Sequence, residues 1–211
     1  MRVVLIVVAF AVALALFASP VLAYTYTLNL IPTADFYEKG SFSLELESSG
    51  EGKLLDFGGG CDEFMYLQFG VNDRLEAGID TCLENGDKVY NAKYLLRQSE
   101  KSPVAIGLQN VGVGARPQTY AVAGFGFDRS VRSHLGLMRI EGKTRALLGA
   151  DTTYGALTFM ADYISGRDNE SSLGVYWETG SFGVTYSSLF PNSSGPTGFV
   201  FNIQYIGKLG R

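Results

Sequence analysis

The residues best suited to chemistry in this sequence are isolated charges set in stretches where apolar and polar side chains alternate. In such a stretch each charge shares one face with small polar residues such as Gly, Ser, Thr and Asn. Charges placed in this way can pair across neighbouring strands, line a water-filled path, or satisfy a polar interior. The candidates are Glu45, Glu47, Arg74, Glu76, Asp80, Lys93, Arg145 and Asp162.

These charges are expected to point into the interior of a barrel, because a basic residue facing lipid at mid-depth costs about 2–4 kcal/mol. Arg74 and Glu76 would then oppose Lys93 as a ladder across adjacent strands. Two interpretations follow. Either the charges form a polar plug and satisfy one another in a packed interior, or they line a narrow water-filled path and select solutes by charge. With about twelve strands a lumen lies between packed and open, and we favour the packed interior.

The only histidine, His134, is the one candidate for a catalytic base. A base needs a nucleophile and an orienting carboxylate in space. Asp128 and Ser130 are close in the chain, but together with His134 they form no known catalytic signature. We therefore expect a histidine at a surface turn and no enzymatic activity, with a membrane-embedded hydrolase or acyltransferase as the third functional reading.

Cys61 and Cys82 are the only cysteines, and they flank an Asn72-Asp73 turn almost symmetrically. A disulfide between them would persist in an exported protein and would add about 3 kcal/mol by loop closure. The alternative is two free thiols, because a slip of one or two residues in the strand register would separate them.

Neither a metal nor a cofactor is expected. The two cysteines have no histidine near them in sequence to complete a metal site. The glycines at Gly58-Gly59-Gly60 and at Gly124 and Gly126 precede no helical segment, so they do not form a phosphate-binding loop.

The first 23 residues have the pattern of a secretory signal peptide. Arg2 precedes an apolar run over Val3–Phe17, and small residues follow up to Ala23. A basic start, an apolar stretch and a small-residue exit define such a signal. We expect cleavage after Ala23, leaving residues 24–211 as one β-barrel domain that begins with an extended segment over residues 24–39.

Alternation with a period of two recurs from Ser41 to the end of the chain and predicts about twelve short strands. Turn residues such as Asn72-Asp73 and Asn85-Gly86 separate them. The predicted strands are Ser41–Ser48, Phe64–Val71, Arg74–Cys82, Tyr90–Leu96, Pro103–Asn110, Thr119–Phe127, His134–Ile140, Arg145–Ala150, Ala156–Ile164, Ser172–Glu178, Phe182–Ser188 and Phe199–Ile206.

Three all-β architectures could follow from this pattern: a soluble sandwich, a soluble ligand barrel and a membrane barrel. Aromatic residues on the apolar faces and small polar residues on the opposite faces favour the membrane barrel. The prediction is an antiparallel up-and-down transmembrane β-barrel with 10–12 strands. It requires the strand near Ser41 to pair with the strand near Phe199. The aromatic residues in question are Phe42, Tyr94, Phe159, Tyr163, Trp177, Phe182 and Tyr186.

Several stretches resemble the outer-membrane β-barrels of the YjbH-like family. They are Ile31–Asp35 with Lys39–Leu44, Gly70–Asp80, Asn91–Gly112 and Leu157–Trp177. The resemblance covers most of the chain after the signal peptide. It implies a bacterial outer-membrane location and a link to envelope and exopolysaccharide processes.

The formal net charge of −4 comes with no basic stripe, so nucleic acid is not an expected partner. The expected partners are outer-membrane lipid and the barrel-assembly machinery. The leading function is an envelope-structural or porin-like role that passes small solutes passively. The alternative is a secreted soluble β-barrel or sandwich that binds a small ligand.

Overall fold

The computed structural model describes residues 27–51, 61–112, 116–126 and 131–210. The predicted signal peptide, Gly58-Gly59-Gly60, Asp128 and Ser130 lie outside these residues. Among the residues described, none forms a helix long and apolar enough to cross a membrane. The strands are β1 (Ser41–Glu51), β2 (Cys61–Gly70), β3 (Leu75–Cys82), β4 (Lys88–Arg97), β5 (Val104–Val111), β6 (Gln118–Gly126), β7 (Val131–Ile140), β8 (Lys143–Tyr154), β9 (Leu157–Ile164), β10 (Glu170–Thr179), β11 (Phe182–Pro191) and β12 (Gly198–Lys208).

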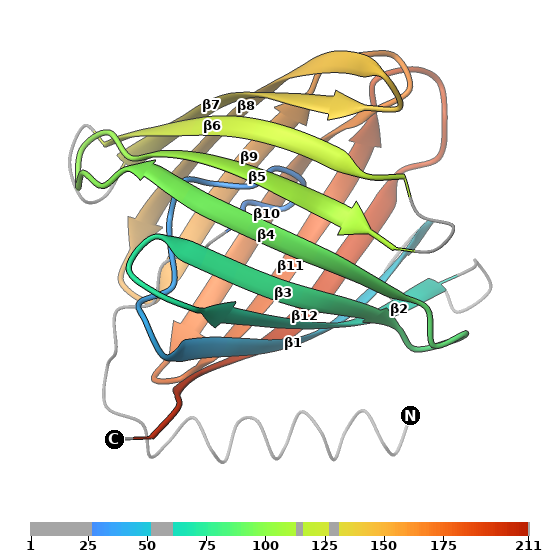
Figure 1. Ribbon diagram of the computed structural model, residues 1–211. Helices are drawn as coiled ribbons and strands as arrows, with labels where there is room; N and C mark the ends of the chain where they lie inside the picture. Colours follow the sequence, from blue (N-terminus) through green and yellow to red (C-terminus); the bar gives the residue numbers. More distant parts are fainter. Residues whose placement is uncertain (1–26, 52–60, 113–115, 127–130, 211) are drawn as a thin grey trace.

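The strands form one closed antiparallel barrel in which each pairs with its neighbours along the chain (Figure 1). The barrel closes between β1 and β12, where Ser43 lies opposite Ile206 and Glu47 opposite Asn202. Closure leaves no sheet edge with unpaired backbone groups, as a bilayer requires. The predicted all-β up-and-down barrel is therefore confirmed, and the sandwich alternative is wrong.

Local turn chemistry explains the short connections. Between β7 and β8 the two linking residues, Glu141 and Gly142, both have positive φ, at 50° and 79°. Positive φ at both positions is the requirement of the type I′ turn that suits a tight hairpin. Between β2 and β3, the Asn72 side chain accepts the backbone N–H groups of Arg74 and Leu75, so this asparagine fixes the turn.

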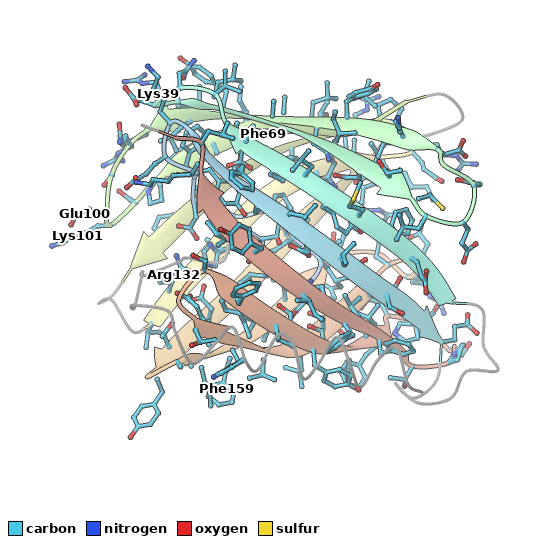
Figure 2. All side chains as sticks on the ribbon, turned by 90° about the horizontal axis from the view of Figure 1, so that it is seen from below. Lys39, Phe69, Glu100, Lys101, Arg132 and Phe159 are labelled. Carbon is cyan, nitrogen blue, oxygen red and sulfur yellow. The ribbon has the colours of Figure 1, made fainter. Side chains whose placement is uncertain are left out.

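Alternation along each strand gives the barrel an apolar exterior. Large side chains such as Leu46, Leu135 and Leu173 are about half exposed, at 49%, 47% and 59%, and Phe159 projects away from the wall (Figure 2). At the end where β1 begins and β12 finishes, rings gather on the outside. Phe42 lies 6.0 Å from Tyr205, which lies 5.1 Å from Phe182. An apolar band edged by aromatic rings suits a bilayer and its interface.

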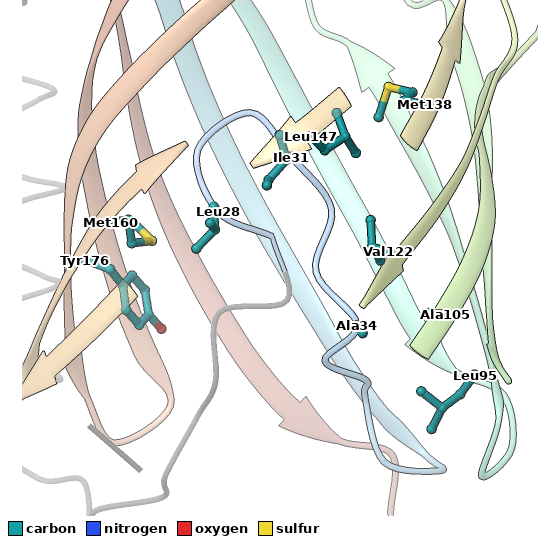
Figure 3. Packing of buried hydrophobic residues seen from close by; sticks show 10 residues of the cluster. All are labelled: Leu28, Ile31, Ala34, Leu95, Ala105, Val122, Met138, Leu147, Met160 and Tyr176. Carbon is teal, nitrogen blue, oxygen red and sulfur yellow. The ribbon is translucent and has the colours of Figure 1, made fainter. Parts of the chain in front are cut away.

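The chain before β1 does not run along the outside of the barrel. Residues 27–40 fold into the lumen, where Figures 1 and 3 show them as the blue segment crossing the interior. A tight turn at its tip joins Thr27 to Pro32 by a β-bridge, and the Leu28 N–H donates to the Ile31 carbonyl at 3.0 Å. We call residues 27–40 the inner segment. The sequence predicted an extended segment here but not that it would enter the lumen.

Two further expectations are corrected by the strand bounds and faces. Arg74 was expected on the lumen face of a strand, but it is exposed in the turn before β3. The Asn72 side chain accepts the backbone N–H of Arg74 and so holds it in that turn. His134 was expected at a surface turn, but it is buried on the inner face of β7, opposite Gly124 and Gly149 of the two adjacent strands.

Candidate functional site: the barrel lumen

The lumen has two unlike halves. From β4 to β9 the wall carries inward-facing apolar side chains that are almost fully buried, and Leu28, Ile31 and Ala34 of the inner segment pack against them in one cluster (Figure 3). Water is thereby kept from this half of the wall. The wall residues are Leu95, Ala105, Val122, Met138, Leu147 and Met160.

A glycine on β8 makes room for the tip of the inner segment. A Cβ atom placed on Gly149 would collide with the side chains of both Leu28 and Ile31. Likewise, a Cβ on Gly70 of β2 would meet the backbone carbonyls of Tyr37 and Glu38 at the other end of the segment. The wall therefore approaches the inner segment closely at both of its ends.

Polar groups of β9, β10 and β11 bind the tip of the inner segment. Asp162 accepts the backbone N–H groups of Leu30 at 2.7 Å and Ile31 at 3.3 Å, and it also accepts the Ser172 hydroxyl. The Asn29 amide nitrogen donates to Ser172 Oγ at 2.7 Å, and the Ser187 hydroxyl donates to the Asn29 amide oxygen. These bonds satisfy backbone groups that would otherwise be buried without partners.

A charged network holds the middle of the inner segment to β7 and β8. Arg132 Nη1 lies 2.7 Å from Asp35 Oδ2, and its Nε lies 2.9 Å from Asp151 Oδ1. His134 Nε2 lies 2.7 Å from Asp151 Oδ2, whereas His134 Nδ1 is buried without a hydrogen-bond partner among the described residues. The histidine thus belongs to a network that anchors the segment.

Nearer β1, a buried ion pair joins the wall to the segment. Lys93 Nζ lies 3.2 Å from Glu76 Oε1, and the two side chains are only 5% and 8% exposed. The second oxygen of Glu76 accepts the Tyr37 backbone N–H at 3.2 Å. Of the ladder predicted here, Glu76 and Lys93 face each other on β3 and β4, and Arg74 lies outside it.

The other half of the lumen, on β10 to β12 and β1 to β3, is polar and borders a cavity of about 310 Å³, which also reaches Lys93 of β4, Gln109 of β5 and Met160 of β9. Three carboxylates line it without an ion-pair partner among the residues described. Glu45 accepts from Asn202 at 2.7 Å, Glu47 from the Tyr66 hydroxyl at 2.9 Å, and Asp80 from Asn91 at 2.6 Å. Within the described part of the chain, Lys93 is the only basic residue that lines this cavity.

Arg145 lies at the opposite end of the barrel from the start of β1, on the inward-facing side of β8. Its guanidinium lies 2.5 Å from Asp168 in the link between β9 and β10, and Lys143 lies 3.3 Å from the same carboxylate. The pKa of Asp168 is held below its ordinary value first by its own backbone N–H and then by Lys143. This ion-pair cluster lies at the rim rather than in the cavity.

The predicted charges thus fall into four groups. Glu45, Glu47 and Asp80 share the cavity, while Glu76, Lys93 and Asp162 bind or border the inner segment. Arg145 is at the rim, and Arg74 is exposed in a turn. The residues that sequence reasoning missed are those of the inner segment, together with Arg132 and Asp151.

The strand register does not place the two cysteines face to face. Cys82 lies opposite Phe64 and is a free thiol. The side chain of Cys61 lies outside the described residues. Phe64 is three positions along β2 from Cys61, so the register offsets the two cysteines, and the state of Cys61 stays a prediction of the sequence. Within the described residues, no three His, Cys, Asp or Glu side chains are grouped so that they could hold a metal ion.

Comparisons with known proteins agree with this architecture. No protein-family model matches the sequence, and no curated protein matches it. Among solved structures, the chain is similar to the KdgM porin, with a TM-score of 0.60, 10% identity, and coverage of 77% of this chain and 98% of that one. The NanC porin gives a TM-score of 0.52 at 11% identity, covering 79% of this chain and 100% of that one. A second KdgM structure, in complex with disordered oligogalacturonate, gives a TM-score of 0.54 at 10% identity, covering 78% and 98% of the two chains. The closed barrel and its apolar exterior place the chain in the bacterial outer membrane. The likeness shows that it has the fold of a porin-type β-barrel.

Proposed function

We propose that the protein is a passive outer-membrane channel for small polar solutes that are neutral or positively charged. The observation that carries the proposal is the cavity of about 310 Å³ inside the barrel, bordered by Glu45, Glu47 and Asp80. Amide and hydroxyl groups complete its polar wall, so a hydrated solute can exchange water for protein hydrogen bonds.

The charge of the wall decides between solute classes. Four carboxylates and one lysine line the cavity among the residues described, and the lysine is already paired with Glu76. Negative charge in a constriction attracts cations and repels anions. Oligogalacturonate, which one of the similar porins holds, is a chain of acids, so this wall does not suit it.

Reversal potentials in planar bilayers test the proposal. In a gradient of potassium chloride the wild type should pass K⁺ in preference to Cl⁻, and the preference should grow as the pH rises because the carboxylates ionise. Glu45→Gln with Glu47→Gln should lower the preference several-fold without closing the channel. The matched control is Glu38→Gln, an exposed carboxylate at the rim. An anion-selective wild type, or one that carries no current, would contradict the proposal.

A non-enzymatic role is part of this proposal. A catalytic histidine needs a nucleophile within hydrogen-bond reach of the nitrogen that takes the proton. His134 uses Nε2 to contact Asp151, and no described hydroxyl or thiol is hydrogen-bonded to its Nδ1. The residues around it hold the inner segment, and this accounts for their charges without any catalytic step.

The resemblance to YjbH-like proteins supports an envelope setting for this channel, linked to exopolysaccharide. It rests on strand and turn stretches, including Ile31–Asp35, which here run from the tip to the middle of the inner segment. Deleting the gene and measuring exopolysaccharide export tests the link. Unchanged export, alongside a measurable current from the purified protein, would separate the channel from the exopolysaccharide role.

A further inference from the structure

The inner segment covers the half of the wall that could not face water. Six apolar side chains on β4 to β9 point inward, which is the wrong chemistry for the wall of an aqueous pore. Leu28, Ile31 and Ala34 lie over them and are 3%, 1% and 2% exposed (Figure 3). Withdrawing the segment would return two apolar surfaces to water at once, and such exposure is unfavourable.

Polar anchors fix the inner segment along its length rather than at one point. The tip is bound by Asp162, Ser172 and Ser187, the middle by Arg132, and the portion next to β1 by Glu76 and by the backbone of Gly70. Buried N–H groups of Leu30, Ile31 and Tyr37 would lose their acceptors if the segment left. A segment meant to swing out would need fewer such bonds, because each buried donor left unpaired carries a penalty.

We infer that the inner segment is a stationary lining that closes the apolar half of the lumen and confines solutes to the acidic half. The inference rests on the proposed channel function. It assigns the inner segment a direct part in selectivity, since Thr27 to Pro32 and Tyr37 form the side of the cavity that faces the carboxylates. A solute therefore passes between the segment and the wall that runs from β10 through β12 and β1 to β4.

Cysteine labelling tests the covering directly. In a background with Cys61→Ser and Cys82→Ser, Val122→Cys lies under the segment and Asn202→Cys faces the cavity. A positively charged trimethylammonium-ethyl methanethiosulfonate, added to the folded protein, should modify Asn202→Cys at least tenfold faster than Val122→Cys. Adding Gly149→Leu, which pushes against Leu28 and Ile31, should make Val122→Cys reactive. Equal rates without that substitution would overturn the inference.

A cross-link tests whether the segment stays in place. Asn29 and Ser187 touch, so Asn29→Cys with Ser187→Cys in the same background can be joined by oxidation and released by reduction. The current should be the same within twofold in both states. If oxidation abolished or strongly changed the current, the segment would be a movable gate and the inference would fall. If no variant carried current in either state, the channel proposal would fail, while the labelling rates would still decide whether the apolar half is covered.

Discussion

Within the lumen, the buried pair of Lys93 and Glu76 is held as much by what surrounds it as by its own attraction. Both charges are removed from water and lie 3.2 Å apart, and Glu76 also accepts the backbone N–H of Tyr37. Breaking such a pair by removing one partner leaves a buried charge without compensation, which is far costlier than losing an exposed pair.

Lys93→Met should therefore destabilise the barrel by about 3 kcal/mol. The double variant with Glu76→Gln should recover part of this loss, because the glutamine oxygen can still accept the Tyr37 N–H while carrying no charge. Urea unfolding in detergent micelles measures both. Lys208→Met is the control, since its pair with Glu38 is 71% and 75% exposed. Equal stability of Lys93→Met and Lys208→Met would contradict the role assigned to the buried pair.

At the rim, Asp168 gives a prediction in pH. The pKa of the Asp168 carboxyl is held below its ordinary value. The stabilisation from its contacts with Lys143 and Arg145 is therefore fully present above the pKa that this carboxyl has in the unfolded chain. It is lost only as the pH falls through the lower folded-state pKa. Lys143→Gln should raise the midpoint measured by carbon NMR of the Asp168 carboxyl, whereas Lys208→Gln at the other end should not. An unchanged midpoint in Lys143→Gln would show that this lysine does not act on Asp168.

Among the elements, the inner segment depends on the small residues of the wall beneath it. Gly149 is the point where β8 lets Leu28 and Ile31 approach, and no larger side chain fits there without moving them. The segment and the apolar half of the wall therefore form one packed unit, as the interior of a small protein would.

Gly149→Leu should displace the tip of the segment and destabilise the barrel by about 1–3 kcal/mol through overpacking. Ala150→Leu is the matched control, because the next residue of the same strand points to the outside. Unfolding in urea and limited proteolysis of the folded protein measure the two effects. If both variants behaved alike, Gly149 would not be the point at which the segment is accommodated.

For the whole molecule, the outward apolar face makes lipid the medium in which the barrel is stable. Leu135 lies near the middle of β7 and is 47% exposed, so Leu135→Arg would place a charge in the hydrocarbon region. The expected cost is about 2–4 kcal/mol for folding into lipid vesicles. Tyr154→Arg, at the end of β8 and 83% exposed, should cost far less because it lies near the interface. Equal costs for the two would contradict the membrane orientation of the barrel.

The sequence by itself determined the barrel. Alternation along twelve stretches, with aromatics on one face and small polar residues on the other, predicts the strands, and the structure has the same number. This could be predicted because strand periodicity is local: each residue chooses a face by its own chemistry. The inward orientation of Glu45, Asp80 and Asp162 follows from the same rule.

Only the tertiary structure decided what fills the barrel. The inward faces from β4 to β9 contain Leu95, Val122, Met138, Leu147 and Met160, and the apolar character of these residues was the one available sign that something covers them. Which segment does so depends on contacts between residues more than a hundred positions apart, as between Leu30 and Asp162. Period-two alternation places a side chain inside or outside the wall. It cannot say what lies across the lumen, because that is set by closure of the barrel and by the packing of the inner segment against it.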